Sequence, residues 1–183
     1  MNDANCFALS EAIDGSGANY KSVWGVIIGS GFGGSFVYEK KVIEGVNQIA
    51  GDWGHQPLPY PTDEEINSNV QCNVGNCKRP LCAEQFISGI GFTKLFNEKY
   101  GTSLRTREIV ALEANGDERA KKEFELYEDR FARLISVMIG IVDPEVIVFG
   151  GGMSNVRRLY DNIPKLLPKY TFSDKIRNKI LQN

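Results

Sequence analysis

The stretch VDPEVIVFGGGMSN, residues 142–155, decides the fold that we expect for this chain. Asp143-Pro144 ends a preceding helix, because the residue before a proline disfavours helical dihedral angles. Residues 145–149 then form a short apolar run typical of a buried strand, and three glycines turn the chain into a helix capped by Ser154 or Asn155. This order of elements predicts an α/β layered fold with a nucleotide-sized crevice at the carboxyl end of the strand.

A longer helix precedes this stretch and begins after Asn115-Gly116-Asp117. Its apolar residues step by alternating fours and threes, which is the period of one helix face. We expect the helix to pack along this whole stripe. The stripe comprises Ala120, Phe124, Tyr127, Phe131, Leu134, Met138 and Ile141.

The N-terminal half of the chain predicts a helix, a hairpin with a glycine-rich tip, a polar loop and a pair of helices. Asn2 or Asp3 is placed to cap the first helix, and Gly15-Ser16-Gly17 closes it. The predicted elements are a helix at 4–13, a strand at 22–28, a turn at 29–34, a strand at 35–38, an extended piece at 41–43, a proline-rich polar loop from 56 to about 70, and two helices within 84–100 that meet at a tight glycine contact at 88–91.

Composition limits the classes of partner. The 183 residues include 42% apolar and 10% aromatic residues, enough for the core of one domain. A formal charge of -2 lacks the basic excess typical of proteins that bind nucleic acid or anionic membranes. No apolar run approaches the roughly 18 to 20 residues of a membrane span, and polar residues follow Met1 directly. We therefore expect a cytoplasmic protein with small-molecule ligands, no nucleic acid and no membrane.

Three cysteines and the one histidine of the chain form the most specific pattern in the sequence. Cys72, Cys77 and Cys82 lie within about a dozen residues, and with His55 they supply the Cys3His set that structural zinc prefers. A buried core histidine is the plainer alternative, but His55 lies between a glycine turn and a proline-rich loop. A nucleic-acid zinc ribbon is a second alternative, yet the cluster lacks a basic, aromatic surface. The fourth cysteine, Cys6, is expected to be a small buried residue.

Three further motifs are ambiguous when each is taken alone. The polar tetrapeptide Asn2-Asp3-Ala4-Asn5 is a helix cap as readily as a catalytic site. The glycine-rich turn at 29–34 offers backbone N–H groups for a phosphate, but many hairpins have glycine tips. Gly150-Gly151-Gly152 suits either a floor beneath an adenosine or a close contact between a helix and a strand.

Taken in order, NDANCFALSEA, GSGFGG, AGDWGH, the cysteine cluster running into CAEQFISGIG, and VDPEVIVFGGGMSN resemble the ROK (repressor, ORF, kinase) family of sugar kinases. The likeness runs from Asn2 to about Ser173 and is nearest to the bacterial fructokinase and N-acetylglucosamine kinase branch. It implies the C-terminal lobe of an actin-like ATPase (ribonuclease H-like) sugar kinase, with a zinc-binding insertion at about 55–84.

The resemblance also implies roles for individual residues. Asp3 is the base that takes the proton from the sugar hydroxyl. His55 both ligates zinc and meets the sugar. Sugar contacts are implied for Asn2, Asp52, His55 and Glu84. Nucleotide contacts are implied for Gly29, Ser30, Gly31, Gly33 and Gly34 and, on the adenosine side, for Gly150, Gly151 and Gly152. Zinc ligands are implied at His55, Cys72, Cys77 and Cys82.

The chain departs from the family pattern at several places. Four residues separate Cys72 from Cys77 where C-x-C is usual, and Asp52 stands where a glutamate is usual. The family's DxGGT phosphate-binding strand-turn does not precede Asn2, and the end of the chain stops before the family's final glycine-containing helix. We therefore expect residues 1–183 to be the C-terminal lobe alone, with the N-terminal domain absent.

The chemistry that the resemblance implies is transfer of the γ-phosphoryl group of ATP, with Mg²⁺, to a primary hydroxyl of fructose, mannose, glucose or N-acetylglucosamine. Zinc (Zn²⁺) would be structural, and a homodimer is a possible assembly. Two alternatives stay open at this point. One is a catalytically silent sugar-binding fragment, and the other is a sugar-responsive transcriptional regulator of the same family.

Overall fold

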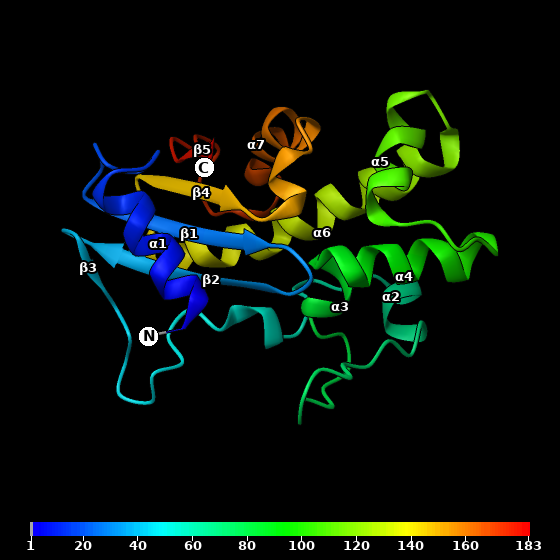
Figure 1. The fold of residues 1–183 in the computed structure, drawn as a ribbon, viewed down its shortest axis with the longest axis horizontal. Helices are drawn as coiled ribbons and strands as arrows, with labels where there is room; N and C mark the ends of the chain where they lie inside the picture. Colours follow the sequence, from blue (N-terminus) through cyan, green and yellow to red (C-terminus); the bar gives the residue numbers. More distant parts are fainter. Residues whose placement is uncertain (1) are drawn as a thin grey trace.

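A five-stranded mixed sheet in the order β3-β2-β1-β4-β5 lies between helices in the computed structural model, which describes residues 2–183 (Figure 1). Strand β1 pairs antiparallel with β2 and parallel with β4. The strands are β1 (Ser22–Ile28), β2 (Phe32–Tyr38), β3 (Lys41–Val42), β4 (Val146–Gly150) and β5 (Lys179–Gln182). The helices are α1 (Asp3–Ile13), α2 (Asp63–Asn67), α3 (Glu84–Ile87), α4 (Gly89–Tyr100), α5 (Thr106–Ala114), α6 (Glu118–Val142) and α7 (Arg158–Tyr170), with 3-10 turns η1 (Trp53–His55) and η2 (Gly152–Asn155).

Alternation of side chains along the strands divides the core into two layers. Val146 and Val148 face α1 and pack with Ala8, whereas Ile147 and Phe149 face the larger core that α6 and α7 complete. Helix α1 lies close to its face because Gly25 of β1 has no side chain, and a Cβ there would stand 2.5 Å from that of Ala8. This confirms the α/β layered architecture and places the start of α1 beside the hairpin.

Helix α6 follows the predicted stripe except at its last turn. Residues from Ala120 to Met138 along the stripe are buried, but Ile141 is 71% exposed. A pattern of alternating fours and threes averages 3.5 residues per turn, so over the 21 residues from Ala120 it lags a helix of 3.6 residues per turn by about 60°. The buried face therefore passes through Ile135 and Ile139 instead.

The hairpin turn is shorter than the sequence predicts. Strand β2 already begins at Phe32, and Gly33 and Gly34 pair with Ile27 and Val26. Gly34 is buried under two tryptophans, because a Cβ there would lie 2.8 Å from the indole nitrogen of Trp24 and 2.9 Å from that of Trp53. The predicted turn at 29–34 is thus wrong at its second half, where Gly33 and Gly34 belong to β2. Close packing explains the glycine at 34, whereas a Cβ at Gly33 would meet no atom within 4 Å.

The proline-rich polar loop was predicted without regular structure, and it contains the short helix α2. The hydroxyl of Thr62 accepts from the Glu65 N–H and the Glu65 carboxylate accepts from the Thr62 N–H, which completes a capping box. The same carboxylate is buried and pairs with Arg130 and Arg133 of α6. These contacts with a distant helix hold α2 in place and could not be read from local pattern.

Two further expectations are corrected, and two elements were not anticipated. The chain after Gly150 forms the turn η2, and α7 begins only at Arg158, because the hydroxyl of Ser154 bonds to the Gly151 carbonyl and does not cap a helix. Cys6 is exposed, since α1 turns Asn5, Ala8 and Ala12 toward the sheet. The two elements that were not anticipated are helix α5 and strand β5.

Among residues 2–183 no helix combines the length and the hydropathy needed to cross a membrane.

Candidate functional site

The first two predicted sugar-site motifs meet at the N-terminus of α1. Asn2 is the N-cap, and its side-chain oxygen accepts from the Asn5 N–H at 2.8 Å. The amide nitrogen of Asn2 lies 3.5 Å from Oδ1 of Asp52, fifty positions along the chain. Asp3 is the first residue of the helix, and its carboxylate is exposed at the positive end of the helix dipole. Asn2 therefore serves as the predicted cap and also links Asp3 with Asp52.

The four predicted metal ligands come together. One ligand atom from each of His55, Cys72, Cys77 and Cys82 lies within 4.8 Å of every other. Nδ1 of His55 is 3.5 Å from the sulfur of Cys82 and 3.8 Å from that of Cys72. Tetrahedral zinc, with bonds of about 2.3 Å to sulfur and about 2.0 Å to nitrogen, requires sulfur–nitrogen separations of about 3.6 Å. The donor set and its spacing therefore fit zinc, and Nε2 of His55 is left free.

The longer spacing between the first two cysteines does not keep Cys77 away from the cluster. The backbone N–H of Arg79 lowers the pKa of the Cys77 thiol, while burial raises the pKa of the Cys82 thiol. The guanidinium of Arg79 also donates to the His55 carbonyl at 3.1 Å. The inserted loop is thus tied to the turn that carries the histidine.

Glu84 joins the cysteine loop, which carries Cys72, Cys77 and Cys82, to the hairpin. Its side chain is 6% exposed, and Oε2 accepts from the Phe32 N–H at 2.9 Å. Burial raises the pKa of this carboxyl, while the Phe32 N–H and the charge of His55 act in the opposite direction. The carboxylate therefore lies between the glycine turn and η1, two residues after Cys82.

The two predicted nucleotide turns line one cavity. Gly29 and Ser30 of the hairpin turn face Gly152 of η2 across a cavity of about 510 Å³ at the carboxyl ends of β1 and β4. No atom lies within 4 Å of a Cβ placed at Gly29 or Gly152, so both offer open backbone. Gly150 and Gly151 instead pack against Phe7 and Ile28. The crevice expected at the strand end is present.

A sequence model described as the ROK family matches residues 1–182. The chain belongs to the ROK family. Curated relatives point to one branch of it. An N-acetyl-D-glucosamine kinase of Vibrio vulnificus is 39% identical over 176 residues, and one of Pasteurella multocida is 40% identical over 171 residues. These alignments cover 94% and 91% of this chain but only 57% and 55% of the relatives, so the chain spans little more than half their length.

Solved structures confirm the fold. A ROK hexokinase of Thermus thermophilus aligns with a TM-score of 0.85 at 22% identity, over 100% of this chain and 58% of that one. A ROK glucokinase of Streptomyces griseus, solved with glucose and AMPPNP, gives 0.83 at 21% identity, over 100% and 62%. A ROK transcriptional regulator also gives 0.83, at 19% identity, over 100% and 46%. The chain therefore has the fold of these ROK structures, which kinases and a transcriptional regulator share.

The ROK motifs did not indicate the helical wall of the 510 Å³ cavity. Ile90 of α4 and Thr106, Arg107 and Val110 of α5 line it opposite the glycines. Thr106, Arg107 and Val110 belong to no recognisable motif, and α5 itself was not predicted. Ile90 and Gly89 lie in the motif CAEQFISGIG, which the family resemblance assigned to the sugar side. The Gly89 N–H donates to the Gly29 carbonyl at 2.8 Å and so joins this motif to the glycine turn.

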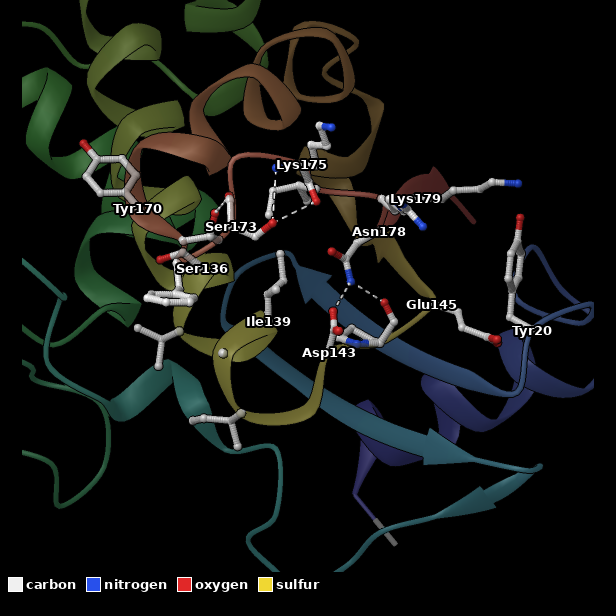
Figure 2. A pocket seen from close by; sticks show the side chains of 18 of the residues that line it. Tyr20, Ser136, Ile139, Asp143, Glu145, Tyr170, Ser173, Lys175, Asn178 and Lys179 are labelled. Atoms are coloured by element: carbon white, nitrogen blue, oxygen red, sulfur yellow. Dashed lines mark hydrogen bonds between the residues drawn. The ribbon is translucent and has the colours of Figure 1, made fainter.

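A second cavity of the ROK lobe, of about 890 Å³, contains none of the predicted site residues (Figure 2). It lies between the end of α6 and the segment 170–179. Figure 2 shows the Asn178 amide donating to the Asp143 carboxylate, at 3.0 Å, and to the Pro144 carbonyl. Because its central polar groups pair with one another, we do not place the chemistry there.

Proposed function

We propose that this chain is the sugar-binding lobe of an ATP-dependent hexose kinase, with N-acetylglucosamine as the hexose. One observation carries the proposal: Asn2, Asp3 and Asp52 meet at the N-terminus of α1, while a glycine-lined cavity opens at the ends of β1 and β4. The kinases of 39–40% identity are named for N-acetyl-D-glucosamine, which favours this sugar over fructose, mannose and glucose.

Asp3 is proposed to act as the general base. It takes the proton from the primary hydroxyl of the hexose as that oxygen attacks the γ-phosphorus of ATP and ADP leaves. Asn2 and Asp52 are proposed to hold neighbouring sugar hydroxyls, because their side chains lie 3.5 Å apart and Asn2 adjoins Asp3 in the chain.

Zinc is proposed to be structural. His55, Cys72, Cys77 and Cys82 would hold the ion through Nδ1 and three thiolates. The bound ion would cross-link η1, the cysteine loop and the residues just before α3. His55 and Glu84 then keep fixed positions, from which Nε2 of His55 and the Glu84 carboxylate can contact the sugar.

The cavity between the hairpin turn and η2 is proposed to hold the nucleotide. Open backbone at Gly29 and Gly152 permits close approach of phosphate and ribose, and Ile90, Val110 and Met153 give the cavity apolar walls suited to a base. Gly31, Gly33, Gly34, Gly150 and Gly151 are proposed to shape the two turns. Mg²⁺ would accompany ATP, as in other phosphoryl transfers.

Titration calorimetry with a panel of sugars tests the assignment. We expect the zinc-loaded chain to bind N-acetylglucosamine more tightly than fructose, mannose or glucose. Asn2→Ala and Asp52→Ala should each weaken binding about tenfold or more, because each leaves a sugar hydroxyl unpaired. Asp14→Ala, an exposed carboxylate at the other end of α1, is the matched control. A wild-type chain that binds none of these sugars would overturn the proposal.

A further inference from the structure

The first tether on the glycine turn is the Glu84 carboxylate. Phe32 follows the turn directly and is the first residue of β2. Its N–H donates to Oε2 of Glu84 at 2.9 Å in a buried environment. A buried N–H that loses its acceptor costs free energy, because no water takes the place of the lost partner. The end of the turn is therefore fixed by a side chain from α3.

The second tether lies at the start of the turn. The Gly29 carbonyl accepts from the Gly89 N–H at 2.8 Å, and a Cβ at Gly89 would stand 3.0 Å from that oxygen. Glu84 and Gly89 both belong to the short segment that begins two residues after the metal ligand Cys82. One segment anchored in the metal cluster thus holds both ends of the turn.

Close packing leaves the carboxylate little freedom. Oε1 of Glu84 lies 3.2 Å from the position of a Cβ at Gly31, and Oε2 lies 3.1 Å from that of a Cβ at Gly54. A Cβ at Gly54 would also come within 2.0 Å of the Phe32 carbonyl. The backbone of Phe32 is therefore held between Glu84 on one side and the residue before His55 on the other.

We propose that Glu84 is a positioning residue for the nucleotide-binding turn, in addition to any contact that it makes with the sugar. The proposal rests on the proposed function only in naming a nucleotide as the ligand of the turn. Through Glu84, the conformation of the loop that carries the three cysteines affects the turn proposed to bind phosphate. The Phe32 N–H requires a side chain long enough to place an acceptor oxygen beside it, and a negative charge on a shorter side chain does not meet this requirement.

Two conservative variants separate the effect of the length of the Glu84 side chain from the effect of its charge. Glu84→Asp keeps the charge but withdraws the carboxylate by one methylene, whereas Glu84→Gln keeps the length and an acceptor oxygen but loses the charge. Glu98→Asp, on the exposed side of α4, is the matched control. Hydrogen exchange at the Phe32 amide and titration with MgADP are measured on zinc-loaded protein, with zinc content and thermal midpoint recorded for each variant.

We expect Phe32 exchange to be about tenfold faster, and MgADP affinity about tenfold weaker, in Glu84→Asp. Both quantities should stay within about threefold of wild type in Glu84→Gln, even where Glu84→Gln loses sugar affinity. If the Phe32 amide exchanges as slowly in Glu84→Asp as in wild type, the proposal is overturned. A wild-type chain that binds no MgADP would instead overturn the nucleotide assignment, while the exchange measurement would still decide the role of Glu84.

Discussion

The sulfur of Cys82 lies 3.5 Å from Nδ1 of His55, although 27 positions separate the two residues in the chain. This contact joins η1, which carries a predicted sugar contact, to the segment that leads into Glu84. Under the proposed function, a zinc ion bound there would take no part in bond making. It would instead make the geometry of the proposed sugar site depend on the metal.

We expect one zinc ion per chain in protein purified without added metal. Cys82→Ser should lose the ion and lower the free energy of unfolding by several kcal/mol, because the binding energy of structural zinc is coupled to folding. Cys6→Ser, at the exposed cysteine of α1, should change neither quantity. Elemental analysis and urea unfolding provide the measurements. Less than about a tenth of an equivalent of zinc, with every thiol titratable in the folded protein, would contradict the assignment.

The ion pairs of Glu65 predict a loss of stability in acid. Burial opposes the charge on this carboxylate, but its bonds to Arg133, Arg130 and the Thr62 N–H outweigh burial and lower its pKa from 4.5 to about 2. A folded-state pKa below the unfolded value stabilises the protein above about pH 4.5, and this stabilisation is lost as the pH falls toward 2.

Glu65→Gln should therefore be less stable than wild type by about 2 to 3 kcal/mol at pH 7, with the difference shrinking between pH 4.5 and 3. Urea unfolding at several pH values measures it. Glu64→Gln, an exposed neighbour on α2, should show no such difference. A wild-type advantage over Glu65→Gln that stays constant from pH 7 to pH 3 would show that the ion pairs do not set the acid response.

Filling the cavity between the two glycine turns should block the nucleotide. Val110→Trp adds a large side chain to the cavity wall on α5, and we expect MgADP affinity to fall at least about tenfold with sugar affinity unchanged. Ile176→Trp, which enlarges a residue lining the 890 Å³ cavity, is the control. Equal MgADP affinity in wild type and Val110→Trp, measured by calorimetry, would show that the nucleotide binds elsewhere.

Local sequence signals predicted those parts of the fold that depend on local structure. Strand β1 was expected at 22–28 and is found there, because an apolar run bounded by a glycine turn needs no distant information. Helix α6 begins after the Asp117 cap as expected. Helix α2 was missed although Thr62 and Glu65 have the spacing of a capping box, and the pairing of Glu65 with α6, which local sequence does not mark, adds to its stability. The exposure of Ile141 was missed because the apolar repeat of seven residues was extended to the end of the helix. By the last turn, a straight helix of 3.6 residues per turn has rotated that position away from the core.

The candidate site divides in the same way. The Cys3His set has chemistry that few other arrangements share, so its residues were recognised from type and count and are found together. The wall of the 510 Å³ cavity consists of ordinary residues, such as Ile90 and Val110, whose placement depends on how α4 and α5 pack. The second function proposed for Glu84 depends on a hydrogen bond to a backbone group 52 positions away, which no sequence pattern marks.

The transfer reaction itself tests the central claim most directly. ADP release is measured with N-acetylglucosamine and MgATP, using the zinc-loaded chain together with the N-terminal part of a related N-acetylglucosamine kinase. Wild type, Asp3→Asn and the control Asp14→Asn are compared. We predict release that depends on the sugar and yields its 6-phosphate, with kcat lower by about 10² to 10⁴-fold in Asp3→Asn and sugar affinity little changed. Turnover retained in Asp3→Asn, or ADP release that does not depend on a hexose, would contradict the account.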